Sequence, residues 1–149
     1  MTDSPNAIVR EIVIAAPPDV VFPYFTDPDK MIVWKAVEAT LDPRPGGIFR
    51  MDVTGHDVAI GEYLEIDPPH RVVFTFGWES AGSPLPPGAS TVEVTLVPDG
   101  EGTRLRLVHR GVPAEIRAGS TKGWDHYLPR LAIAAEGGTP GPDPWASAD

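Results

Sequence analysis

The chain has 149 residues, no cysteine and a formal net charge of −9, and 42% of its residues are hydrophobic while 22% are charged. This size and composition predict a single globular domain. The absence of cysteine excludes disulfides, thiolate metal sites and a cysteine nucleophile, and the acidic balance argues against nucleic acids and anionic membrane surfaces as partners.

The first six residues are polar and are not followed by the basic and apolar segments of a signal peptide. The apolar runs elsewhere in the sequence are far shorter than a membrane span. We therefore expect a cytoplasmic protein.

Seven segments are rich in β-branched and aromatic residues or alternate between apolar and polar residues, which predicts strands. They cover residues 8–15, 37–41, 48–53, 58–66, 71–78, 91–97 and 103–109. After the first of them, prolines open a helix expected over residues 18–26, in which Pro23 limits the regularity. A short helical turn is expected to follow, up to Trp34. Gly61 is compatible with a bulge in the fourth strand.

The last predicted element is a long helix over residues 113–136. Apolar residues at helical spacing predict its inner stripe: Trp124, Leu128, Leu131 and Ala135. Pro129 removes a backbone hydrogen bond and should kink the helix, and two glycines after residue 136 end it. We expect one domain over residues 1–138 and a disordered, proline-rich acidic tail over residues 139–149.

This order of elements predicts an α+β fold. A curved antiparallel sheet of six or seven strands would wrap around the long C-terminal helix, with one or two short helices after the first strand. A sheet that is covered by a helix on one face needs the alternation of apolar and polar residues seen here.

Several short segments resemble the helix-grip superfamily of START-related and birch-pollen-allergen-like domains (SRPBCC). Within this superfamily the chain is most similar to the group of activator-of-heat-shock-ATPase homologues. The resemblance rests on the order and spacing of these segments and reaches almost to Gly138. They are residues 16–22, Trp34, residues 44–50, 61–69 and 102–105, and Gly123-Trp124 with Leu128 and Leu131.

The resemblance implies a fold rather than one activity, because the superfamily includes lipid carriers, hormone-binding proteins, polyketide cyclases, aromatases and chaperone cofactors. Eukaryotic chaperone activators of this group carry a large additional N-terminal domain, whereas this chain begins at the first strand. We therefore do not expect it to be a chaperone activator.

In helix-grip proteins the terminal helix stands off the sheet and leaves a mainly apolar cavity, with a few polar groups that orient a ligand. The inner faces of the predicted strands and helix supply the candidate walls, although the same side chains could simply fill a core. The expected ligand-binding residues are Trp34, Phe49, Met51, Phe74, Phe76, Trp78, Leu105, Leu107, His109, Trp124, Tyr127, Leu128 and Leu131.

Three ionisable residues are candidates for proton transfer. His109 ends an inward-facing stretch and could act as an acid, a base or an orienting donor, or could be a hydrogen-bonded structural histidine. Glu62 and Glu65 lie in a strand whose inner face the pattern does not decide, so either carboxylate could face the cavity or the solvent. His126 is expected in solvent, and the scattered histidines predict no metal site.

Three functions are compatible with these features. The first is a protein that binds an apolar or aromatic small molecule. The second is a cofactor-free enzyme of the cyclase, dehydratase or isomerase kind, in which His109 with Glu62 or Glu65 moves protons. The third is a domain that interacts with a chaperone, and a homodimer is compatible with each of the three.

Overall fold

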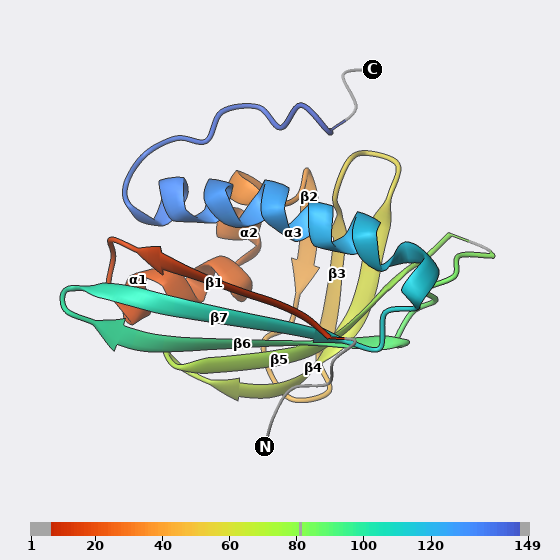
Figure 1. Cartoon of the computed structure of the whole chain (residues 1–149), viewed down its shortest axis with the longest axis horizontal. Coiled ribbons are helices and arrows are strands. Elements are labelled where there is room, and N and C mark those ends of the chain that lie inside the picture. Colours follow the sequence, from red (N-terminus) through yellow and green to blue (C-terminus); the bar gives the residue numbers. More distant parts are fainter. Residues whose placement is uncertain (1–6, 81, 147–149) are drawn as a thin grey trace.

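The computed structural model describes residues 7–80 and 82–146, and these form seven strands, three α-helices and one 3-10 helix. The elements in chain order are β1 (Ile8–Ile14), α1 (Pro18–Val21), η1 (Phe22–Phe25), α2 (Pro28–Trp34), β2 (Glu38–Leu41), β3 (Ile48–Asp52), β4 (Val58–Asp67), β5 (Arg71–Trp78), β6 (Ser90–Asp99), β7 (Gly102–Arg110) and α3 (Ala114–Ala135). The long helix α3 lies across one face of the sheet (Figure 1). The predicted α+β helix-grip fold is confirmed.

The strands form one sheet in the order β1-β7-β6-β5-β4-β3-β2, and every neighbouring pair is antiparallel. Because β1 pairs with β7, the first and last strands lie side by side, with β1 at the edge of the sheet. In β7 the side chains of Leu105, Leu107 and His109 are buried, whereas Arg104 is exposed. This confirms the predicted inner face of that strand.

The sequence pattern leaves the inner face of β4 undecided, and the structure shows which of its residues face the core. Ala59 and Tyr63 are fully buried, whereas Leu64 is exposed. The register with β5 shifts between Tyr63 and Glu65, so the expectation of a bulge at Gly61 is wrong. A Cβ at Gly61 would lie 1.9 Å from the Thr75 carbonyl oxygen, so close approach to β5 is what requires glycine at this position.

Prolines mark the starts of the three short helices. The segment predicted as one helix over residues 18–26 divides into α1 and the 3-10 helix η1, which has Pro23 near its start. The next helix, α2, begins at Pro28, and the Asp27 side chain caps it by accepting a 2.9 Å hydrogen bond from the Asp29 backbone N–H. The long helix α3 continues through Pro129 as one element of 22 residues.

The packed core lies between the sheet, the short helices and the C-terminal half of α3. Aromatic rings dominate it: Phe49 stacks on Phe74 at a centroid distance of 4.0 Å, and Phe25 meets Trp34 edge-on at 5.5 Å. The Trp34 indole N–H also donates to the Tyr24 carbonyl, so the polar atom of this buried ring is satisfied. These rings pack closely against one another, and a smaller cavity of about 320 Å³ lies beside them, bordered by Trp34, Arg130 and the C-terminal segment.

The segment after α3 was predicted to be disordered. Residues 139–146 have no helix or strand, but they run back along α3 (Figure 1). The Arg130 guanidinium donates to the Gly141 carbonyl oxygen at 2.9 Å, and the Trp145 ring stacks on the His126 ring at 3.9 Å. Residues 147–149 of the predicted tail lie outside the described residues.

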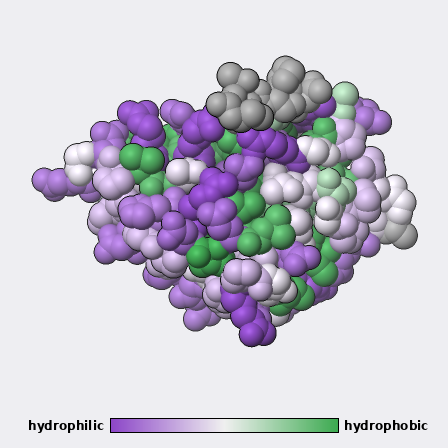
Figure 2. All heavy atoms as spheres, turned by 90° about the horizontal axis from the view of Figure 1, so that it is seen from below, coloured by the Kyte–Doolittle hydropathy of each residue, from purple (hydrophilic) through white to green (hydrophobic). Residues whose placement is uncertain are grey.

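Hydrophilic residues occupy most of the face seen from below, with smaller apolar groups between them (Figure 2). The exposed large apolar side chains are spread over several elements. Val13, Leu64 and Val97, for example, belong to β1, β4 and β6, respectively. Isolated exposed apolar residues of this kind are normal for protein surfaces.

Candidate functional site

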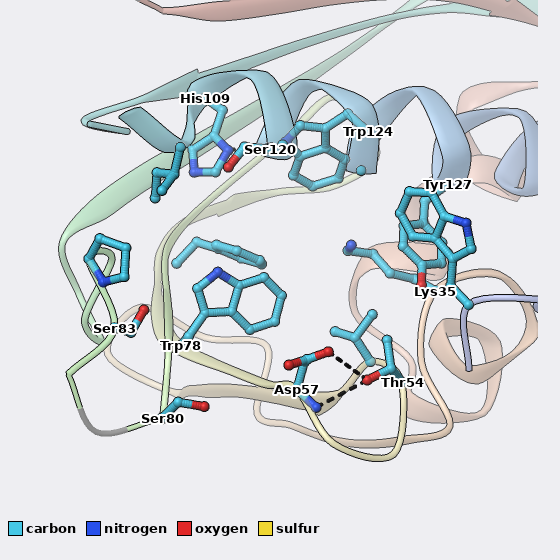
Figure 3. A pocket seen from close by; sticks show the side chains of 17 residues that line it. Lys35, Thr54, Asp57, Trp78, Ser80, Ser83, His109, Ser120, Trp124 and Tyr127 are labelled. Carbon is cyan, nitrogen blue, oxygen red and sulfur yellow. Dashed lines mark hydrogen bonds between the residues drawn. The ribbon is translucent and has the colours of Figure 1, made fainter. Parts of the chain in front are cut away.

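A cavity of about 520 Å³ lies between the N-terminal half of α3 and the end of the sheet where β5 finishes (Figure 3). Its volume falls within the range of small-molecule sites. The residues that line it come from α3, β5, β7, the β3–β4 turn, the loop after β5, the end of α2 and the C-terminal segment. They are Lys35, Val53, Thr54, Asp57, Phe76, Trp78, Ser80, Ser83, Pro84, His109, Ile116, Gly119, Ser120, Gly123, Trp124, Tyr127 and Trp145.

One face of α3 forms the roof of this cavity. Its lining residues recur three and four positions apart, which places them on a single helical face. Two of them are glycines, and a Cβ at Gly119 or Gly123 would meet no atom within 4 Å. The missing side chains therefore leave open space between the helix and the strands. In the sequence alone, glycines at these positions would indicate only a lower helix propensity.

Five of the residues expected to bind a ligand line the cavity: Phe76, Trp78, His109, Trp124 and Tyr127. Seven others belong to the buried core and do not line it: Phe49, Met51, Phe74, Leu105, Leu107, Leu128 and Leu131. Trp34, which was also expected to bind a ligand, is only 1% exposed and lies against Phe25 in the core. The pattern identified the inner face correctly, but only one end of that face is hollow.

His109 is held by hydrogen bonds at both ring nitrogens. The Trp124 indole N–H donates to Nδ1 at 3.0 Å, and Nε2 lies 2.8 Å from the Ser90 hydroxyl oxygen. The Ser90 hydroxyl itself donates to the Phe76 carbonyl at 2.6 Å, so Nε2 must carry the proton that Ser90 accepts. Burial, together with the neighbouring Lys35 charge, lowers the pKa of His109 from 6.5 to about 4. The ring is therefore neutral near pH 7, and both of its nitrogens are occupied.

Neither candidate carboxylate faces the cavity. Glu62 and Glu65 are both exposed on β4. The Glu65 carboxylate accepts hydrogen bonds from the Arg71 guanidinium at 3.1 Å, on the outer side of the sheet. The structure thus brings neither glutamate near His109.

Among the lining residues that sequence reasoning missed, the basic one is Lys35, which immediately follows α2. Its side chain is buried, with 6% of the residue exposed, and its Nζ atom points into the cavity toward the space between Trp78 and Trp124 (Figure 3). Nζ lies 4.3 Å from the centroid of the Tyr127 ring and 4.7 Å from that of Trp124. Burial lowers the pKa of Lys35 from 10.5 to about 7, and the Asp143 charge offsets only part of this shift.

The C-terminal segment closes one side of the cavity. The Tyr127 hydroxyl donates to one Asp143 carboxylate oxygen at 2.6 Å, and His126 Nε2 lies 2.7 Å from the other. Burial would raise the pKa of Asp143, but hydrogen bonds from Tyr127, His126 and the Trp145 backbone hold it below its usual value. The expectation that His126 is free in solvent is therefore wrong, because the ring is half-buried between Asp143 and Trp145.

Two further properties follow from the described part of the chain. None of its helices is long and apolar enough to cross a membrane. Among these same residues, no group of three or more histidine, aspartate or glutamate side chains is arranged to hold a metal ion.

Comparison with known proteins identifies the same architecture. Residues 15–136 match the family described as Activator of Hsp90 ATPase homolog 1-like protein. No curated protein is significantly similar to the chain.

Solved structures of bacterial proteins share the fold along almost the whole chain. An AHSA1-like protein from Rhizobium etli is 44% identical, with a TM-score of 0.74, and the match covers 96% of this chain and 89% of that one. Protein CV1439 from Chromobacterium violaceum is 30% identical, with a TM-score of 0.79 and coverage of 89% and 99%. The protein described as the Aha1 dimer from Colwellia psychrerythraea is 18% identical, with a TM-score of 0.76 and coverage of 89% and 97%.

Proposed function

The chain belongs to the Activator of Hsp90 ATPase homolog 1-like family, and on this basis we propose that it binds a small, largely aromatic molecule in the cavity beneath α3. The observation that carries the proposal is the roughly 520 Å³ of open space lined by Phe76, Trp78 and Trp124. Buried aromatic surface left in contact with open space is a favourable site for an apolar ligand, because binding removes that surface from water.

The glycines of α3 support this proposal. Alanine is the best helix former and glycine one of the poorest, so two glycines inside a helix cost about 1 kcal/mol each. Gly119 and Gly123 both line the cavity, and neither has a neighbour that would exclude a Cβ. Neither position therefore requires glycine for packing, whereas a side chain at either would take up cavity volume.

The test is a substitution that fills the cavity. We expect wild-type protein to bind N-phenyl-1-naphthylamine, an uncharged aromatic probe whose fluorescence rises in apolar surroundings, with one site per chain. In Gly123→Leu the new side chain occupies the space between α3 and Trp78. The probe affinity should then fall by about tenfold or more, which corresponds to the loss of roughly one buried aromatic ring face.

The matched control is Ala118→Leu, which adds a leucine to an exposed position of the same helix. This variant should bind the probe as the wild type does, and circular dichroism should show that both variants are folded. Equal probe binding by wild type and Gly123→Leu, or no binding by the wild type, would overturn the proposal.

The alternative of an enzyme with His109 as its base finds no support in this geometry. Both His109 nitrogens are engaged, by Trp124 and Ser90, and the proton-transfer partners expected for it, Glu62 and Glu65, are exposed on β4. Proton transfer needs a base with a free lone pair within hydrogen-bond reach of the substrate. The binding function therefore fits the arrangement better.

We further propose that the chain forms a homodimer, an assembly with which the sequence is compatible. Support comes from the related Colwellia psychrerythraea protein that is described as a dimer. Symmetric dimers are the commonest assemblies of soluble proteins. Size-exclusion chromatography with light scattering tests this proposal, and a monomeric mass across the working concentration range would contradict it.

A further inference from the structure

Lys35 is the only lysine or arginine among the described residues that line the cavity. No described residue accepts a hydrogen bond from its Nζ atom or forms an ion pair with it. Three aromatic rings surround it, and the Asp143 carboxylate acts on it only through its charge. A buried ammonium group without a hydrogen-bond acceptor is costly, and in most proteins such a group is paired. The lack of a hydrogen-bond acceptor for the Lys35 ammonium group is thus a property of this cavity that the fold alone does not explain.

The other ionisable groups around the cavity do not supply that partner. The Asp143 oxygens already accept hydrogen bonds from Tyr127, His126 and the Trp145 backbone. Asp57, in the β3–β4 turn, is exposed and accepts a hydrogen bond from Thr54. His109 and Tyr127 direct their polar atoms to other residues. The Lys35 ammonium therefore faces the open space.

We propose that Lys35 receives an anionic group of the bound molecule, so that the ligands of this protein are aromatic acids with a carboxylate, or a similar anion, on a planar ring system. This inference rests on the proposed binding function and specifies its ligand class. An incoming anion would satisfy the ammonium, and the ring system attached to it would lie against Phe76, Trp78 and Trp124.

Three aromatic rings stabilise the Lys35 ammonium group in the absence of a bound anion. The Nζ atom lies within 6 Å of the ring centroids of Phe76, Trp124 and Tyr127, at 5.9, 4.7 and 4.3 Å. Aromatic faces attract a cation at such distances, but they stabilise it less than a hydrogen-bonded anion does. The rings therefore hold the ammonium weakly and leave its hydrogens available.

Proton uptake should accompany the binding of an acid. Near pH 7 the lysine is protonated in only part of the molecules, because its pKa is about 7. A bound anion favours the ammonium and raises that pKa, so binding at a somewhat higher pH draws a proton from the buffer. His109, Asp57, Asp143 and Tyr127 keep their own partners in both states, so Lys35 is the expected source of this signal.

The experiment compares 2-naphthoate with 2-naphthamide, which have nearly the same shape but differ in charge. Isothermal titration at about pH 8 in two buffers of different ionisation enthalpy gives both the affinity and the number of protons taken up. We expect wild-type protein to bind the acid about tenfold or more tightly than the amide, with uptake approaching one proton for the acid and none for the amide.

The variant Lys35→Met keeps the length and the apolar part of the side chain but removes its charge. It should lose the preference for the acid and the proton uptake, while its affinity for the amide changes by no more than about threefold. Lys122→Met is the matched control, since it removes the same charge from an exposed position on α3. That variant should behave as the wild type.

The outcomes separate this inference from the proposed function. If wild type binds N-phenyl-1-naphthylamine but shows neither a preference for the acid nor proton uptake, the role of Lys35 is wrong and the binding function stands. If wild type binds neither the probe nor the naphthalenes, both proposals fail. The proton count needs only the wild-type protein, so the inference can be overturned even if Lys35→Met does not fold.

Discussion

At the scale of single residues, the buried Lys35 should lower the stability of the protein. Its pKa is about 7 in the folded chain and 10.5 when exposed, so between these values the unfolded chain binds more protons. The free energy of unfolding must then rise as the pH rises from about 7 to about 10.5, and it gains nothing from this residue below that window. A charged group that costs stability in the folded state is typical of a functional site.

The same argument predicts the effect of Lys35→Met on stability. At pH 7 the variant should unfold with a free energy about 1 to 4 kcal/mol higher than the wild type, because it removes a buried charge without a hydrogen-bonded partner. The difference should shrink toward pH 10, where the lysine of the folded wild type is neutral. Urea unfolding at the two pH values measures it, and a variant that is less stable than the wild type at both would contradict the prediction.

At the scale of elements, the hydrogen bonds of His109 join α3 to three strands. Trp124 belongs to α3, whereas His109, Ser90 and the Phe76 carbonyl belong to β7, β6 and β5. The chain of donors requires a neutral ring with its proton on Nε2. We expect nitrogen NMR shifts of the folded protein to show this single tautomer, unchanged between about pH 5.5 and 8, because the pKa of His109 is lowered to about 4.

This network also predicts how stability depends on acid. The unfolded chain takes up a proton at His109 below about pH 6.5, whereas the folded chain does so only near pH 4. The contribution of His109 to stability is therefore complete above about pH 6.5 and is lost as the pH falls toward 4. A ring that titrates near neutral pH in the folded protein would show that the network is open, and would restore His109 as a candidate base.

The elements themselves could largely be predicted from the sequence, whereas the cavity could not. Alternation placed Phe76, Trp78 and His109 on the inner face, because that pattern depends only on the period of a strand. The distance between α3 and the sheet depends on tertiary packing, and for this reason Phe49 and Phe74 proved to be core. The one local signal for the cavity was the pair Gly119 and Gly123 on the face of α3 that also carries Trp124.

The buried lysine had no signal in the sequence. Lysine is almost always exposed, so a single lysine after a short helix predicts a solvent position. Lys35 is buried because α2, the β5 strand and α3 meet around it, and these elements are far apart along the chain. Glu62 shows the reverse case: its strand has an apolar parity that faces outward, since β4 buries the small Ala59 and the aromatic Tyr63 instead.

At the scale of the whole molecule, the N-terminal half of α3 covers the larger cavity whereas its C-terminal half buries apolar side chains in the core, and this division should govern local unfolding. The C-terminal half of α3 buries Leu128, Leu131 and Ala135 in the core, and Arg130 ties it to the Trp34 carbonyl. The N-terminal half instead covers the cavity with Gly119 and Gly123, which contribute few contacts and lower helix propensity. Segments with fewer buried contacts open at a lower free energy than the rest of the fold.

Hydrogen exchange measured by mass spectrometry should therefore divide α3 in two. Without a ligand, amides of residues 114–123 should exchange faster than those of residues 127–135. Saturating N-phenyl-1-naphthylamine should slow the first group, because a ligand that binds only the closed cavity stabilises it by mass action, and should leave the second group nearly unchanged. Ala118→Leu should show the same protection, whereas Gly123→Leu should exchange slowly without the probe. Uniform exchange along α3 without the probe would contradict the division of the helix into two halves. Protection by the probe that is confined to residues 127–135 would contradict a site beneath the N-terminal half of the helix.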